Sequence, residues 1–202
     1  MVKLILATNN KNKLREIREM LADTDVFVVA QAEAGYDFDV EETGTTFAEN
    51  AEIKAEAIWN AARERGEACY VLADDSGLSV DALNGEPGVF SHRWAGEHAT
   101  DADRIAKLLD ALRKIPDEKR GAHFACCMCL ITDDGVHHIF EGRVEGVILH
   151  TPRGENGFGY DPVFGYGDRS FAELSAEEKN AVSHRHNALT QVLAYFRERT
   201  AN

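Results

Sequence analysis

Apolar residues recur along the chain in two alternating spacings, one typical of buried strands and one typical of amphipathic helices. Mostly apolar runs of strand length cover residues 2–8 and 26–31. Between them the apolar positions follow a helical period, at Leu14, Ile17, Met20 and Leu21. A long helix is predicted to begin at Thr46, which forms a capping-box pair with Glu49, and to end at Gly66.

The second half of the chain continues this alternation. A short apolar strand is predicted at 70–73, and a helix at 101–114 with Thr100 as its N-cap. Two further strands, 122–132 and 136–147, flank the turn residues Asp133-Asp134-Gly135 and predict a β-hairpin. The last helix begins either at Ser175, which pairs with Glu178 as a capping box, or at Ser183.

Interleaved strands and helices predict an α/β fold class, with a mixed, elongated central β-sheet flanked by helices. We expect residues 1–202 to form a single domain of two lobes, with the active cleft between them. The 44% of hydrophobic residues beside 28% of charged residues excludes intrinsic disorder. The longest apolar run, residues 124–131, is shorter than the ~20 residues of a membrane helix. The first residues turn polar too early for a signal peptide, so we expect a cytoplasmic protein without a membrane partner.

The net charge of −13 changes the picture of possible partners. An acidic protein repels the phosphates of nucleic acids, so we expect no nucleic-acid partner. A small polyphosphate can still bind where cations gather locally or a metal ion intervenes. The cysteines Cys126, Cys127 and Cys129 lie in an apolar run, which favours reduced core packing over a zinc site with two spaced ligand pairs.

Four polar segments lie at the edges of predicted elements, and the first two offer cations. Residues 8–13 follow the first strand and open a helix, where backbone N–H groups and the helix dipole suit a phosphate. Lys11 and Lys13 add positive charge there, although an Asn-rich turn with solvated lysines is the simpler interpretation. The second segment, residues 41–47, enters the long helix, in which Asn50 and Lys54 share a face.

The other two segments offer carboxylates and an aromatic slot. Asp74 and Asp75 follow a strand, where an open α/β sheet places its ligands, and a carboxylate there can hold Mg²⁺; a turn is the alternative. Because side chains alternate along a strand, only one of the two needs to face the cleft. In residues 157–162 two glycines surround an aromatic residue that can stack on a base, or that simply fills the core.

Together these segments resemble the house-cleaning inosine/xanthosine triphosphate pyrophosphatase family, which removes non-standard purine nucleotides. The resemblance extends over nearly the whole chain and rests on six motifs: Thr8-x-Asn10-x-x-Lys13-x-x-Glu16, Glu42-Thr43-Gly44-x-Thr46-Phe47-x-x-Asn50-Ala51-x-x-Lys54-Ala55, Ala73-Asp74-Asp75-Ser76-Gly77-Leu78, Pro87-Gly88-Val89-Phe90-Ser91-x-Arg93, Phe158-Gly159-Tyr160-Asp161-Pro162-x-Phe164, and Lys179 with Ser183-His184-Arg185. The chain departs from the family pattern at Asn9, Phe90 and His92.

The resemblance implies Mg²⁺-dependent hydrolysis of ITP, dITP and XTP to the monophosphate and pyrophosphate by a homodimer. It implies that Glu42 and Asp75 ligate the metal and that Asp75 is the catalytic proton acceptor. The remaining site residues it implies bind substrate, and they are Thr8, Asn9, Asn10, Lys11, Asn12, Lys13, Lys54, Ser76, Phe158, Gly159, Tyr160, Asp161, Lys179, His184 and Arg185. A pyrophosphatase for other bases, such as modified pyrimidines, and a nucleotide-binding regulatory module without turnover are the alternatives.

Overall fold

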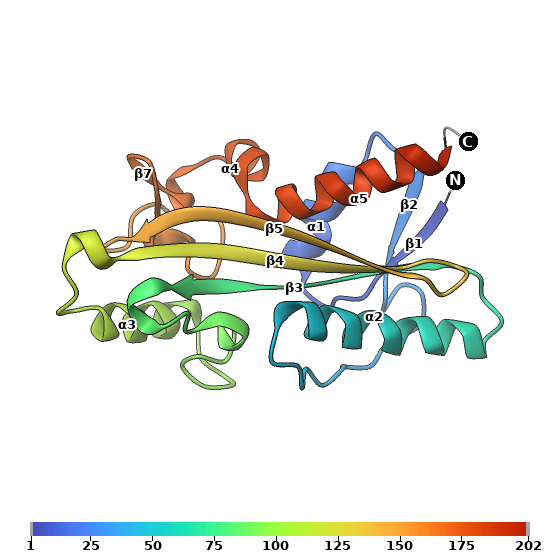
Figure 1. Ribbon diagram of the computed structural model, residues 1–202, viewed down its shortest axis with the longest axis horizontal. Coiled ribbons are helices and arrows are strands. Elements are labelled where there is room, and N and C mark those ends of the chain that lie inside the picture. Colours follow the sequence, from blue (N-terminus) through green and yellow to red (C-terminus); the bar gives the residue numbers. More distant parts are fainter. Residues whose placement is uncertain (1, 201–202) are drawn as a thin grey trace. The chain divides into compact units, whose positions relative to one another are not determined.

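The protein combines one β-sheet with α-helices, as the alternating pattern predicts. A computed structural model describes residues 2–200, in which seven strands form a sheet of order β2-β1-β3-β4-β5-β6-β7 (Figure 1). The strands are β1 (Val2–Leu6), β2 (Val26–Ala30), β3 (Tyr70–Val80), β4 (Gly121–Ile131), β5 (His137–Ile148), β6 (Phe164–Tyr166) and β7 (Arg169–Ser170). The helices are α1 (Lys11–Leu21), α2 (Phe47–Glu64), α3 (Asp101–Ala111), α4 (Ala176–Val182) and α5 (His184–Thr200). The predicted mixed α/β class is therefore confirmed.

The chain folds as two compact units. Unit 1 contains the residues up to 75, then 126–142 and those from 186 onward, whereas unit 2 contains residues 76–125 and 143–185. Strands β3, β4 and β5 each contribute residues to both units. The interpretation of the two units as lobes of one domain stays a prediction.

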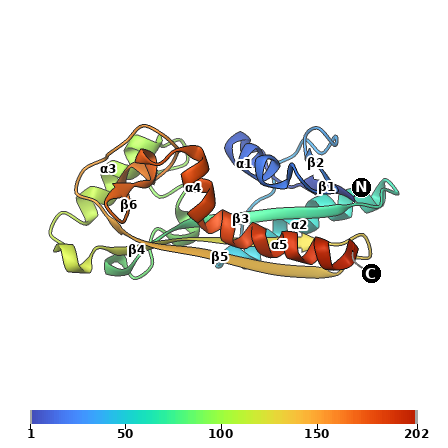
Figure 2. The same ribbon diagram turned by 90° about the horizontal axis from the view of Figure 1, so that it is seen from above.

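In unit 1 helices cover both faces of the sheet. Strand β1 pairs in parallel with β2 and β3, so its side chains alternate between the two faces. Leu4 and Leu6 pack with Ile17 of α1 and with Leu189 of α5, while Ile5 packs on the opposite face with the alanine-rich stripe of α2. Figures 1 and 2 show α1 and α5 on one side of these strands and α2 on the other. Two separate apolar clusters thus hold the start of α1, α2 and the middle of β3 in fixed places.

Unit 2 has its own core, which is rich in aromatic side chains. Phe124 of β4 packs on Phe164 with ring centroids 4.6 Å apart, and Phe164 meets Phe171 edge to face at 4.8 Å. Leu78 of β3 and Leu108 of α3 complete the cluster. Aromatic pairs in this geometry add about 0.5–1.5 kcal/mol beyond the burial of their area. The segment after β5 is therefore anchored by its aromatic residues despite its glycine-rich sequence.

Side-chain caps set the starts of the helices where the sequence predicts them. Thr46 with Glu49 caps α2, Thr100 with Asp103 caps α3, and Ser175 with Glu178 caps α4, each as a complete capping box. Ser183 ends α4, and α5 begins at the next residue. The two alternative starts predicted for the last helix, Ser175 and Ser183, therefore precede two separate helices, α4 and α5. The predicted hairpin is also confirmed, with Gly135 at φ +86° in its turn.

The strand predicted at 70–73 is longer than expected. Strand β3 runs on to Val80, so Asp74 and Asp75 lie in the middle of a strand and not at its end or in a turn. Leu78 and Val80 explain the extension, because both are fully buried in the core of unit 2 and continue the strand's apolar contacts past the polar residues. The predicted end at residue 73 is wrong, because the polar Asp74 that follows it is not the boundary of the strand.

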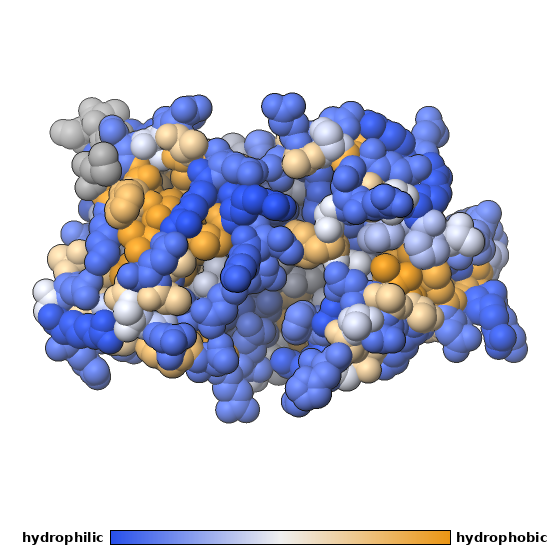
Figure 3. All heavy atoms as spheres, turned by 180° about the vertical axis from the view of Figure 1, so that it is seen from behind, coloured by the Kyte–Doolittle hydropathy of each residue, from blue (hydrophilic) through white to orange (hydrophobic). Residues whose placement is uncertain are grey.

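Polar residues dominate the surface that the structure describes. Figure 3 shows one face on which hydrophilic residues surround smaller apolar areas. Among residues 2–200, each helix is too short or too polar to cross a lipid bilayer.

Candidate functional site: a carboxylate–lysine cluster and a glycine-rich loop

In unit 1 two carboxylates from distant parts of the chain meet at one lysine. Lys54, on the second turn of α2, has its Nζ 2.7 Å from Oε1 of Glu42 and 3.8 Å from Oδ1 of Asp75. The Lys54 side chain is only 13% exposed, and that of Asp75 is 9% exposed. The ammonium therefore lies where a cation is needed to hold the two acids together. Two carboxylate oxygens converging on one positive charge fit the donor set of a hard divalent ion.

Burial and charge shift the pKa values of this cluster. Burial alone would lower the pKa of Lys54, but the charges of Asp75, Asp74 and Glu42 raise it above its ordinary value. Burial raises the pKa of Asp75, although Lys54 acts against this shift. A carboxylate with a raised pKa is a stronger proton acceptor, which is the property that a general base needs.

Asn50 fixes the orientation of Asp75 from the same face of α2. Its Nδ2 donates to Oδ2 of Asp75 at 3.1 Å, and its Oδ1 accepts the N–H of Gly44 at 2.8 Å. A Cβ at Gly44 would lie 2.6 Å from that Oδ1, which is too close for any other residue. The glycine thus lets the segment that carries Glu42 approach α2.

Asp74 points to a different partner, as the alternation along β3 requires. Its side chain is fully buried and pairs with Nζ of Lys13 at 3.0 Å. Asp74 therefore faces α1 and Asp75 faces α2. Each acid of the pair has its own lysine, so both take part in the charged cluster.

The loop after β1 is arranged differently from a bare phosphate-binding turn. Asn10 is the N-cap of α1, and its side chain accepts the N–H groups of Asn12 and Lys13. Asn9 donates to Asp39 at 2.7 Å, and Thr8 accepts the N–H of Asn10. The N–H groups of Asn12 and Lys13 are therefore bound by the cap of the helix, and phosphate binding by this segment stays a prediction. Positive charge from Lys11 and Lys13 is what the segment offers.

In unit 2 the residues Gly157–Asp161, which we call the glycine loop, are closed by an ion pair. Oδ2 of Asp161 accepts Nζ of Lys179 at 2.6 Å and the N–H of Phe158 at 2.9 Å. Lys179 also lies over the Phe158 ring, 4.6 Å from its centroid. A Cβ at Gly157 would lie 2.1 Å from that same Oδ2, and φ at Gly157 is +76°, so glycine is required.

The other predicted substrate residues of unit 2 lie in buried positions. Arg185 is 2% exposed, and its Nη2 donates to Oγ of Ser76 at 3.4 Å. His184 stacks on Phe124 with ring centroids 5.0 Å apart. Tyr160 is buried as well, and burial raises the pKa of its hydroxyl, which therefore stays protonated.

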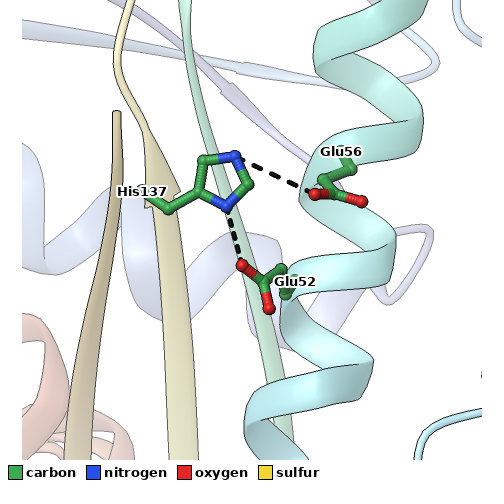
Figure 4. A group of neighbouring side chains, drawn as sticks. All are labelled: Glu52, Glu56 and His137. Carbon is green, nitrogen blue, oxygen red and sulfur yellow. Dashed lines mark hydrogen bonds and ion pairs between the residues drawn. The ribbon is translucent and has the colours of Figure 1, made fainter. Parts of the chain in front are cut away.

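A second acidic group in unit 1 could also hold a cation. His137 of β5 has Nδ1 2.7 Å from Glu52 and Nε2 4.0 Å from Glu56, one turn further along α2 (Figure 4). Ligand atoms of the three side chains lie within 4.8 Å of one another. Both ring nitrogens already face carboxylates, so the group is explained as a surface ion-pair cluster. No pattern in the sequence indicates this group, because Glu56 and His137 are 81 residues apart and belong to no motif.

The chain is similar to known proteins over nearly its whole length. The model of the Ham1 family matches residues 4–195. A Clostridium perfringens protein named dITP/XTP pyrophosphatase is 46% identical over 195 residues, which are 95% of this chain and 96% of that protein. A protein of the same name from Streptomyces avermitilis is 48% identical over 202 residues and 98% of each chain.

Two solved structures are similar along the whole fold. The Ham1 protein of Staphylococcus aureus has a TM-score of 0.87 at 41% identity, covering 98% of this chain and 99% of that one. The HAM1 protein of Coxiella burnetii has a TM-score of 0.86 at 46% identity, covering 98% and 100%. From the family model, the relatives and these folds together, we conclude that the chain belongs to the Ham1 family.

Proposed function

We propose that this protein hydrolyses the non-standard purine nucleoside triphosphates ITP, dITP and XTP to the monophosphate and pyrophosphate. One observation carries the proposal, which is that Glu42 and Asp75 meet at the Lys54 ammonium. The names of relatives at 46–48% identity over almost the full chain support this choice of reaction.

Glu42 and Asp75 are the residues that would hold Mg²⁺. When bound there, the ion would neutralise phosphate charge and lower the pKa of a water molecule. Asp75 accepts the proton of the attacking water at a carboxylate oxygen. Asn50 keeps this carboxylate oriented through its hydrogen bond.

The cations and polar groups of unit 1 bind the triphosphate. Lys54 has two carboxylate partners and can turn to phosphate oxygens when these acids take a metal ion instead. Lys11 and Lys13 supply further charge at the start of α1, and Thr8, Asn9, Asn10 and Asn12 shape the turn that presents them. Positioning and charge stabilisation of this kind account for most of the rate in phosphoryl transfer.

The residues of unit 2 bind the nucleoside. Phe158 offers a ring face for stacking, and the other residues assigned to the nucleoside are Ser76, Gly159, Tyr160, Asp161, Lys179 and His184. The N–H of Phe158 donates to Asp161 and that of Gly159 to Asp101, so these backbone donors are already used. We assign the six-oxygen of hypoxanthine and xanthine, which adenine replaces with an amino group, to Arg185, a buried side chain with several N–H donors.

A pyrophosphate-release assay over the nucleoside triphosphates, with and without Mg²⁺, tests the proposal. We expect release from ITP, dITP and XTP that stops when EDTA removes the metal, and slow release from ATP. Turnover of modified pyrimidine nucleotides instead would favour a related pyrophosphatase. Nucleotide binding without pyrophosphate release would favour a regulatory module and contradict the enzyme assignment.

The homodimer and the cytoplasmic location belong to the same proposal. The homodimer comes from the family resemblance and not from a contact between chains, whereas the cytoplasmic location comes from the sequence pattern. Light scattering and size-exclusion chromatography of the purified protein measure the first directly.

A further inference from the structure

The motif at residues 87–93 has no part in the proposed reaction, yet its backbone is tied to the glycine loop. The buried hydroxyl of Tyr160 donates to the carbonyl oxygen of Ser91 at 3.0 Å. The Ser91 hydroxyl accepts the N–H of Leu78 at 2.9 Å and donates to the carbonyl oxygen of Gly88 at 2.6 Å. Ser91 is thus fixed to β3, and the Tyr160 ring is fixed to Ser91.

A second tie runs from the glycine loop to the start of α3. Oδ2 of Asp101 accepts the N–H of Gly159 at 2.8 Å, and Oδ1 of the same carboxylate pairs with Arg104. Arg104 is 7% exposed, and its Nε donates to the carbonyl oxygen of His92 at 2.6 Å. The path from Gly159 through Asp101 and Arg104 therefore ends beside Ser91, where the Tyr160 hydroxyl is bound.

This closed path adds a restraint at Gly159 to the one that Asp161 provides at the N–H of Phe158. Gly159 has φ +65°, in a region that glycine enters easily and also leaves easily. Ordering such a loop costs affinity when it happens during binding, and a loop that is ordered beforehand avoids this cost. The hydrogen bond to Asp101 fixes the peptide next to Phe158, which is the ring assigned to the base.

We propose that Asp101 and Arg104 are positioning residues for the purine base, because they hold Gly159 in the conformation that presents Phe158. The proposal rests on the proposed function for the role of Phe158. In the proposed function the chemistry falls to Asp75, whereas Asp101 and Arg104 act on the glycine loop through the hydrogen bond to Gly159. Their loss therefore raises KM and leaves kcat nearly unchanged.

Steady-state kinetics of Asp101→Ala with ITP tests this proposal. We expect KM to rise roughly two- to tenfold, the range for one lost hydrogen bond, while kcat stays within about twofold. The Asp101 side chain is 49% exposed, so the effect is modest. Asp101→Asn keeps an oxygen that can accept the Gly159 N–H and should restore KM towards the wild-type value.

Asp103→Ala is the matched control on the same turn of α3. Asp103 accepts hydrogen bonds from the N–H and the hydroxyl of Thr100, so its loss lowers the melting temperature. It should leave KM for ITP unchanged. Equal KM values for Asp101→Ala and the wild type would overturn the proposal, and so would an equal rise in both alanine variants.

Amide hydrogen exchange at Gly159 gives a readout that does not depend on turnover. We expect faster exchange in Asp101→Ala than in the wild type and in Asp103→Ala. Unchanged exchange in Asp101→Ala would contradict the proposal that Asp101 restrains Gly159. If the wild type released no pyrophosphate from ITP, the proposed function would fail, whereas the exchange at Gly159 would still decide whether Asp101 restrains the loop.

Discussion

The carboxylate–lysine cluster of unit 1 and the glycine loop of unit 2 differ in how their acidic and basic side chains pair. In unit 1 the Lys54 ammonium lies near two carboxylates, and its Nζ is 3.8 Å from Oδ1 of Asp75, the more distant of the two. The two negative charges of Glu42 and Asp75 therefore exceed the one positive charge of Lys54. In unit 2 Lys179 and Asp161 form a compact, buried pair at 2.6 Å. In the proposed function the first arrangement exchanges its cation for a metal ion and a phosphate, whereas the second holds the glycine loop in place. The difference separates the residues to which we assign the reaction from those to which we assign the choice of base.

The largest effect is expected from Asp75→Asn, which removes the proposed base and one metal ligand. Turnover of ITP should fall by about 10²–10⁴-fold, the usual contribution of a general base, while the circular dichroism spectrum stays that of the wild type. The exposed Asp23→Asn makes the same chemical change away from the cluster and is expected to keep full activity. Near-normal turnover by Asp75→Asn at saturating Mg²⁺ would remove the reactive role from unit 1.

Lys54→Met tests whether the ammonium stands in for a bound cation. Without it Glu42 and Asp75 lose the positive charge that they share, and breaking a buried ion pair in this way costs about 3–5 kcal/mol. We expect a lower melting temperature in EDTA and a partial recovery in excess Mg²⁺, because the ion can take the place between the acids. Calorimetry with and without metal measures both values.

The exposed Lys114→Met serves as the control for this loss of a lysine. It should leave the melting temperature unchanged under both conditions. A Lys54→Met protein that is destabilised equally in EDTA and in Mg²⁺ would contradict the exchange of one cation for another.

Arg185→Ala tests the selecting part of the site in unit 2. A buried donor without its partner costs about 1–3 kcal/mol, so the preference for ITP over ATP in kcat/KM should fall by about tenfold. Arg113→Ala, which removes an exposed arginine of the same unit, should leave the ratio unchanged. An unaltered ratio in Arg185→Ala would show that another group reads the six-oxygen.

The smallest effects are expected at the helix caps of the two units. Thr46→Ala and Thr100→Ala each remove a capping side chain, and each should lower the free energy of unfolding by about 1 kcal/mol. The functional consequences should differ, because α2 carries Asn50 and Lys54 of the reactive cluster while α3 carries Asp101. We expect Thr46→Ala to reduce kcat and Thr100→Ala to leave kcat unchanged; urea denaturation measures the stability of each variant, and steady-state kinetics measures its kcat. Equal effects on kcat would contradict the division between the two units.

Local rules in the sequence determined the helices and the chemistry that they carry. The capping pairs fix the starts of α2, α3 and α4 because each satisfies backbone N–H groups within four residues. The helical spacing of Asn50 and Lys54 places both on one face of α2, and strand alternation sends Asp74 and Asp75 to different partners. These relations need no knowledge of the rest of the chain.

Tertiary structure alone decided how far β3 extends and what restrains the glycine loop. The strand continues to Val80 because the core of unit 2 buries Leu78 and Val80, and a pattern of single residues does not contain that contact. Asp101 reaches Gly159 across 58 positions of sequence, and Tyr160 reaches Ser91 across 69. Such contacts depend on the packing of elements that are distant in the chain. The sequence therefore predicted the glycine loop, whereas only the tertiary structure showed which residues restrain it.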